Sequence, residues 1–397
     1  MRALCLNGNE RRSQLGVPFA MGNDGDVTYP PPGFDVPLSE RPPTRKAGVM
    51  AATGLVSSLM ISILTVAPAP FAIAQAGPTY DTLAAYDGTS VISIEGLPTY
   101  DSTGELRLTT VSFSRGGSRT FTLGQVIGAF FSEHRTVRPE EDIFGTPEEQ
   151  QREAEESQEM WVISQESATV AAIEALGEVV PTTLTVDGIT DESGALGVLE
   201  DGDILLAIDG EEFRSYNDLT SQLERRRPGD EATFTVMRGT QELDVTFPLI
   251  AYDDDPETAR MGIFVLPTFD LPITVSVGIA EVSGPSAGLM FALAIMDKLT
   301  PIDELNGAHV AGTGAIDIDG QVSPIGGIEH KMHGAAAAGA TAFLAPIENC
   351  KDVVGHVPPG LDVYAVDTLV DAYAAITAIG QDDTADLLTC AAAVEKE

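Results

Sequence analysis

One serine in this sequence lies in a local setting that suits a nucleophile. Residues 283–288 read SGPSAG, and a helix is predicted from Ala287 to Leu299. Gly284 allows a sharp backbone turn and Pro285 fixes its own φ, so Ser286 should lie at the N-terminus of this helix. Unpaired N–H groups there stabilise developing negative charge, as a nucleophile requires. An ordinary N-cap serine would occupy the same position.

A serine hydroxyl needs a base to react at neutral pH, and this sequence offers few. None of its five histidines stands in a recognisable Ser-His-Asp order. A lysine can serve instead, because burial disfavours the ammonium form and lowers the pKa. Lys331 stands among Gly, Ala, Ile and Met residues, on a helix predicted from Ile328 to Ala338. It is therefore a candidate general base, and a lysine on the outer face of that helix is the alternative.

Two other groups of polar residues raise the question of a metal. His330 and His333 could share one helical face, but no further ligand is evident. Asp317 and Asp319 could suggest calcium, but no ligand loop continues from them, and a hairpin turning at Asp319-Gly320 explains them better. We therefore predict no metal and no cofactor.

The order of these residues resembles the proteolytic domain of Lon-type serine proteases, peptidase family S16. The shared features are GPSAG at 284–288, Thr313-Gly314, PIGG at 324–327, Lys331 and APxxNxKD at 345–352. The resemblance implies that Ser286 attacks the peptide carbonyl and that Lys331 is the general base. It also implies that Thr313 orients the lysine. Lon enzymes usually carry an acidic residue where this chain has Ser283, which leaves the role of any acidic partner open.

Residues 177–250 resemble the PDZ domains of bacterial membrane and periplasmic proteases. A Gly-Asp turn, a buried strand and an Asp-Gly turn fill residues 199–210, and a helix from Asn217 to Arg226 and a strand from Thr233 to Arg238 follow. PDZ domains bind extended peptide ends by adding a strand to a sheet edge. A PDZ fold that serves only as a spacer is the alternative, and no carboxylate-binding loop is identifiable.

The N-terminal part reads as a tail and an anchor. Residues 1–46, rich in Pro, Gly, Asn and Asp, predict a disordered cytoplasmic tail. Residues 47–74 carry no charge and predict a transmembrane anchor, with Arg45 and Lys46 on the cytoplasmic side and the rest of the chain outside the cell membrane. A cleaved signal peptide is the alternative, because small residues at 72–76 fit a cleavage site.

The expected fold class is α+β: a transmembrane helix, a small mixed region at 77–176, the PDZ domain, and a Lon-type proteolytic domain at 251–390. No Gly-x-x-x-x-Gly-Lys-Ser/Thr phosphate loop occurs in the sequence, so ATP-driven unfolding is not expected. This order is similar to the anchored PDZ–Lon proteases of actinobacteria and bacilli. It implies an ATP-independent endopeptidase that cleaves extracytoplasmic proteins. The PDZ domain would bring protein or peptide substrates to it, and the enzyme could form homo-oligomers.

The net charge limits the classes of binding partner, and the cysteines bear on the compartment. The net charge is −38, and residues 77–397 carry 16 basic against 55 acidic groups, which argues against nucleic acid as a partner. Cys350 and Cys390 could pair in an oxidising compartment. Two further functions stay open: a non-catalytic PDZ peptide-binding protein with a protease-fold scaffold, and a Ser-Lys amidase or esterase.

Overall fold

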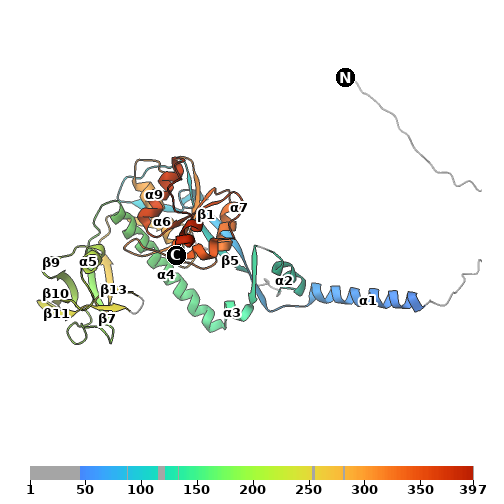
Figure 1. The fold of residues 1–397 in the computed structure, drawn as a ribbon, viewed down its shortest axis with the longest axis horizontal. Helices are drawn as coiled ribbons and strands as arrows, with labels where there is room; N and C mark the ends of the chain where they lie inside the picture. The colour runs from blue at the N-terminus through green and yellow to red at the C-terminus, as the bar shows by residue number, and fades with distance from the viewer. Residues whose placement is uncertain are drawn as a thin grey trace, which may run out of the picture. The chain divides into compact units, whose positions relative to one another are not determined.

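The computed structural model describes residues 45–86, 88–114, 121–132, 134–252, 255–279 and 282–396 (Figure 1). The predicted tail therefore lies outside the described residues, except for Arg45 and Lys46. The chain divides into two compact units, residues 1–59 and 60–397, and the sheets all belong to the second unit.

Helix α1 (Arg45–Val66) is the predicted anchor. By length and composition, Arg45–Thr65 could cross a membrane, and none of its apolar window is buried. At about 1.5 Å per residue, a helix of 22 residues is about 33 Å long, enough for a hydrocarbon core of about 30 Å. The helix ends earlier than the predicted 47–74. Pro68 and Pro70 lack the N–H that would continue it, and strand β1 (Phe71–Asp81) follows.

A six-stranded sheet forms the larger domain. Its order is β20 (Asp362–Val366), β19 (Ala342–Pro346), β16 (His309–Gly312), β5 (Glu105–Ser114), β1 and β6 (Arg135–Pro139). The first four strands are parallel, and β1 runs antiparallel to both β5 and β6. The expected mixed region at 77–176 is thus no separate layer, because β5 pairs directly with β16.

The helices of this domain are α2 (Leu123–Phe130), α3 (Glu140–Phe144), α4 (Pro147–Ala175), α6 (Gly288–Leu299), α7 (Ile328–Ala337), α8 (Cys350–Val353), α9 (Leu369–Gly380), α10 (Cys390–Lys396) and the 3-10 turn Ile347–Asn349. Helix α6 is buried over most of its length, and Trp161 of α4 packs edge-to-face on Phe291 at 5.2 Å between ring centroids. Helix α4 has 29 residues and begins with a capping box at Thr146.

Short strand pairs complete the domain: β2 (Ala85–Tyr86) with β3 (Thr89–Ser90), β4 (Ile92–Glu95) with β15 (Thr274–Val277), and β17 (Ala315–Ile316) with β18 (Val322–Ser323). The last pair is the hairpin predicted at Asp319-Gly320. Gly320 has a φ of +81°, which favours glycine, and its N–H donates to the carbonyl of Asp317 at 3.0 Å. Turn chemistry therefore explains these aspartates.

The smaller domain has its own sheet and core. The sheet order is β11 (Gln241–Pro248), β10 (Glu231–Arg238), β8 (Ile204–Ile208), β7 (Thr182–Ile189) and β14 (Ile263–Phe269). Strand β9 (Glu211–Glu212) pairs with β8, and helix α5 is Tyr216–Glu224. Phe234 and Phe247 stack at 4.7 Å in its core. Strand β14 lies beyond the expected boundary at 250, because the pair β12 (Ile250–Tyr252) and β13 (Asp255–Arg260) returns the chain to β7.

A disulfide between Cys350 and Cys390 joins α8 to α10. Both residues are buried in a small cluster with Ile328, Met332 and Phe343. The bond therefore fixes the C-terminal helix against the layer that contains α7.

Reducing this bond should destabilise the larger domain. It closes a loop with a sequence separation of 40, and such cross-links contribute about 2–4 kcal/mol. We expect urea unfolding to show that reductant lowers the unfolding free energy by this amount. Cys5→Ser should leave the loss unchanged, and equal unfolding free energies in the two states would contradict this role.

Candidate active site

A tight turn held by helix α4 presents Ser286. Gly284 has a φ of +83°, which favours glycine, and its N–H donates to the carbonyl of Ser157 at 3.0 Å. The hydroxyl of Ser164 donates to the carbonyl of Pro285 at 3.1 Å. Sequence reasoning missed this positioning role of α4, because a contact to a backbone carbonyl leaves no pattern in the sequence.

Ser286 is not the N-cap of α6. That position belongs to Ala287, which makes no side-chain capping bond, so the N-cap alternative for Ser286 is wrong. The carbonyl of Ser286 accepts hydrogen bonds from the Gly314 N–H at 3.0 Å and from the Thr313 hydroxyl at 2.9 Å. Two bonds to its carbonyl fix the backbone of this half-buried serine and leave its hydroxyl on the cavity.

Lys331 reaches the same place from α7. Its Nζ donates to the Thr313 hydroxyl oxygen at 2.9 Å, and that hydroxyl in turn donates to the Ser286 carbonyl. Thr313 is fully buried just after β16, and the exposed fraction of Lys331 is 3%. The structure thus brings together the three residues that the sequence singled out, and a surface position for Lys331 is wrong.

Burial lowers the pKa of Lys331 from 10.5 to about 8. The cause is desolvation, which penalises the ammonium form far more than the neutral amine. An amine with such a pKa is neutral in an appreciable fraction of molecules near pH 7 and can accept a proton. Chemically, the arrangement suits abstraction of a proton from a neighbouring hydroxyl.

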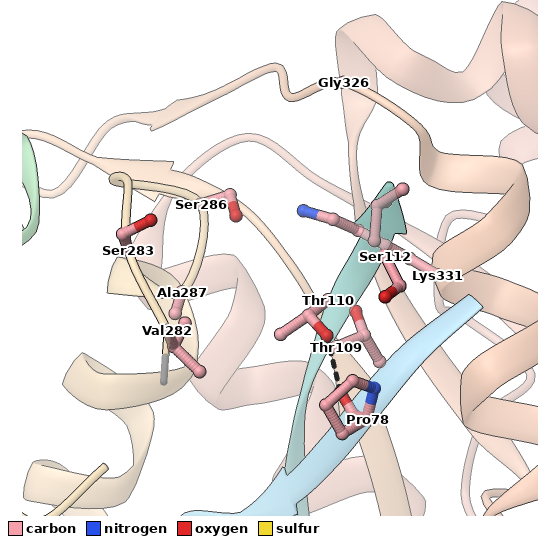
Figure 2. A pocket seen from close by; sticks show the side chains of 11 residues that line it. Pro78, Thr109, Thr110, Ser112, Val282, Ser283, Ser286, Ala287, Gly326 and Lys331 are labelled. Carbon is pink, nitrogen blue, oxygen red and sulfur yellow. Dashed lines mark hydrogen bonds between the residues drawn. The ribbon is translucent and has the colours of Figure 1, made fainter. Parts of the chain in front are cut away.

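Ser286 and Lys331 line one cavity of about 420 Å³, and Figure 2 shows the amine of Lys331 directed toward the Ser286 side chain. The cavity is also lined by Pro78, Thr109, Thr110, Val111, Ser112, Val282, Ser283, Ala287 and Gly326. Pro78 and the residues of β5 come from the region before the smaller domain. Sequence reasoning missed them, because nothing in the strand pattern reveals which strand lies beside β16.

Asn349 fixes the loop in front of α7. Its side-chain oxygen accepts from the Ile325 N–H at 2.9 Å and its amide donates to the Ile325 carbonyl at 3.0 Å. This loop contains Gly326, which lines the cavity, and Gly327, the left-handed N-cap of α7 with a φ of +71°. In the sequence, Asn349 belongs to a shared motif but has no evident role. In the structure it holds the loop that leads into α7, the helix that carries Lys331.

The histidines beside Lys331 lie outside this cavity. His333 Nε2 is 3.2 Å from Nδ1 of His134, while Nδ1 of the buried His330 has no hydrogen-bond partner among the described residues. Over the described ranges, no group of three or more His, Cys, Asp or Glu residues is arranged to hold a metal ion.

A second groove, of about 360 Å³, lies on the smaller domain and is also lined by Asp319 of the larger domain. Tyr216, Leu219 and Leu223 of α5 line it together with Ile263 and Val265 of β14. Strand β14 ends the sheet, so its outer edge is available to an added strand.

Comparison with known families identifies two domains in this chain. Residues 163–249 match the PDZ domain, and residues 259–376 match the Lon protease (S16) C-terminal proteolytic domain. The chain therefore combines a PDZ domain with a Lon-type proteolytic domain, as the sequence predicted. The Lon match begins after β1 and β5, although both strands contribute to the cavity.

Similar proteins share only part of their length with this chain. A Lon protease of Campylobacter concisus is 33% identical over 140 residues, which are 34% of this chain and 17% of that protein. Lon protease 1 of Bacillus subtilis is 40% identical over 85 residues, 21% of this chain and 11% of that protein. A PDZ domain of an SdrC-like protein from Listeria monocytogenes is 25% identical, covering 21% of this chain and 86% of that structure, with a TM-score of 0.20. The chain thus spans less than a fifth of the Lon proteases it matches.

Replacing Lys331 by methionine should stabilise the protein at neutral pH. Between about pH 8 and 10.5 the unfolded lysine holds a proton that the folded one has lost, so the unfolding free energy rises with pH. Below pH 8 the folded protein bears the full cost of the buried ammonium. The unfolding free energy there is about 3 kcal/mol lower than above pH 10.5. Lys331→Met should remove this rise, as measured by urea unfolding at pH 7 and 10.

The matched control is Lys396→Met, at an exposed position at the end of α10. It should keep the wild-type dependence on pH. If Lys331→Met kept that dependence as well, the lowered pKa of Lys331 would be wrong.

Proposed function

We propose that this protein is a membrane-anchored serine endopeptidase that works without ATP, with Ser286 as nucleophile and Lys331 as general base. The observation that carries the proposal is the buried Lys331 amine. It is bonded to Thr313 and lies in one cavity with Ser286, inside a Lon-type proteolytic domain. Among the described residues, the hydrogen bond of this amine is to the Thr313 hydroxyl and not to a carboxylate. A buried cation without such a partner is costly, and general-base catalysis explains why the chain keeps one.

The reaction follows from these positions. The neutral amine of Lys331 accepts the proton of the Ser286 hydroxyl as Oγ bonds to the peptide carbonyl carbon. The ammonium then gives this proton to the departing amine, and the C–N bond breaks to leave an acyl-serine. Water attacks the acyl-serine with Lys331 again accepting a proton, which releases the acid and restores the serine.

The backbone at the start of α6 is placed to stabilise the oxyanion. Among the described residues, the N–H groups of Ser286 and Ala287 make no hydrogen bond, whereas those of Gly288 and Leu289 donate to the carbonyls of Pro285 and Gly314. Free N–H groups at a helix N-terminus bind a negative oxygen well.

Thr313 acts as a positioning residue in this proposal. Its hydroxyl proton goes to the Ser286 carbonyl, so its oxygen is left to accept from the lysine amine. This fixes the position of Nζ and couples it to the serine backbone.

Two features suit an extended peptide substrate. Strand β5 pairs with β16 only as far as Leu108, so its continuation along the cavity, residues 109–112, has an edge that β16 does not cover. An extended peptide can add its main-chain hydrogen bonds there. The PDZ groove, whose lining combines apolar side chains with Glu224, Arg260 and Asp319, would recruit or gate such substrates beside the end strand.

The anchor and the disulfide suggest where the enzyme works. Arg45 and Lys46 at the start of α1 favour a cytoplasmic N-terminus and a proteolytic domain outside the cell membrane. A disulfide between Cys350 and Cys390 suits that oxidising side. The sequence carries no phosphate loop, in keeping with hydrolysis that needs no ATP.

Ser286→Ala should abolish peptide hydrolysis. Loss of a nucleophile in a site whose residues act as a unit costs on the order of 10³-fold or more in kcat. Casein hydrolysis by the full chain in detergent measures it. Ser283→Ala, which alters an exposed serine of the same cavity, is the matched control and should stay within a few-fold of wild type. Comparable turnover by Ser286→Ala would exclude this nucleophile.

Activity should rise with pH up to the pKa of the base. Because Lys331 must be neutral and has a pKa of about 8, kcat/KM should increase about tenfold per pH unit below that value and level off above it. Hydrolysis of a fluorogenic peptide between pH 6 and pH 10 gives the profile. A rate that is flat across this range would rule out Lys331 as the base.

A further inference from the structure

Helix α2 leaves an aromatic face uncovered. It buries Val126 and Ala129 against the sheet, while Ile127, Phe130 and the following Phe131 have exposed fractions of 42%, 75% and 82%. The rings of Phe130 and Phe131 lie edge-to-face at 5.9 Å. Contiguous exposed aromatic side chains on a soluble surface indicate an interaction site.

This face also lacks charge. Residues 120–132 contain no Asp, Glu, Lys or Arg, in a chain with a net charge of −38. Most of the outer surface of this protein is therefore unsuited to an anionic or apolar layer, whereas α2 carries no charge that would have to be desolvated there.

The position of α2 identifies its partner. The N–H of Leu123 donates to the carbonyl of Ala67 at 3.1 Å, and the N–H of Ala69 donates to the carbonyl of Phe121 at 2.7 Å. A Cβ atom at Gly124 would lie 3.0 Å from the carbonyl oxygen of Leu64, so this glycine lets α2 approach the last turn of α1. The last turn of α1 and helix α2 therefore lie side by side within one compact unit, residues 60–397, so a bilayer that α1 crosses as far as this turn ends beside α2.

We propose that α2 lies in the interfacial layer of the bilayer crossed by α1, with Ile127, Phe130 and Phe131 inserted between lipid headgroups and acyl chains. The inference rests on the membrane anchoring proposed above and extends it. Interfacial helices insert side chains such as Phe and Leu to this depth, and the strength of binding scales with the apolar area that they bury. A single helix leaves a domain free to rotate about the helix axis, and a second contact removes that freedom.

Tryptophan substitution and depth-selective quenching test this contact. The full chain is placed in phosphatidylcholine nanodiscs, either plain or brominated near the start of the acyl chains. Phe131→Trp reports on α2, and Leu59→Trp reports on α1. Phe264→Trp, at a β14 residue that is 64% exposed, is the matched control. The native Trp161 is 5% exposed and provides a common background.

We expect brominated lipid to remove most of the emission added by Phe131→Trp, and also that added by Leu59→Trp, but not that added by Phe264→Trp. Quenching of Leu59→Trp without Phe131→Trp would overturn the α2 contact and leave the anchor intact. In that case blue-shifted emission of Phe131→Trp would indicate cover by a second copy, and red-shifted emission an uncovered helix. Quenching of neither variant would overturn both the anchor and the α2 contact.

Discussion

The hydrogen bond between the Lys331 amine and the Thr313 hydroxyl is the interaction on which the site depends. A lysine with an exposed fraction of 3% cannot be hydrated as an ammonium, so its pKa falls to about 8 and its position is set by one neutral partner. That partner is oriented by the Ser286 carbonyl. The lysine amine and the serine backbone are thus joined through a single hydroxyl, and a shift of any of the three would misplace the others.

The elements that hold this interaction come from distant parts of the sequence. Strands β5 and β16 are neighbours in the sheet, yet α4 and the whole PDZ sheet lie between them in the chain. The PDZ domain is thus inserted between two strands of one proteolytic sheet. Helix α4 on the N-terminal side of this insertion holds the serine turn through Ser157 and Ser164. The connection between β6 and β16, which includes α4, therefore runs beside the turn that carries Ser286.

The sequence was most informative where function restricts residue types locally. The turn around Ser286, the hairpin at Gly320 and helix α7 each combine a glycine at positive φ or an apolar run with a fixed spacing, and these elements were predicted nearly to their ends. It was least informative about pairing at long range. The local pattern does not predict that β5 pairs with β16 or that β14 joins the PDZ sheet. The residues of a strand do not show which strand it pairs with. For the same reason the cavity residues of β5 and the support from Asn349 emerged only with the structure.

Covalent labelling of Ser286 tests the central claim most directly. The full chain is treated with a fluorophosphonate, which reacts with activated serine hydroxyls, and the modified peptides are identified by mass spectrometry. The account predicts a single adduct on Ser286, formed at a rate that rises with pH toward about 8 and that Lys331→Met abolishes. An unmodified Ser286, or labelling that is as fast in Lys331→Met as in wild type, would contradict it.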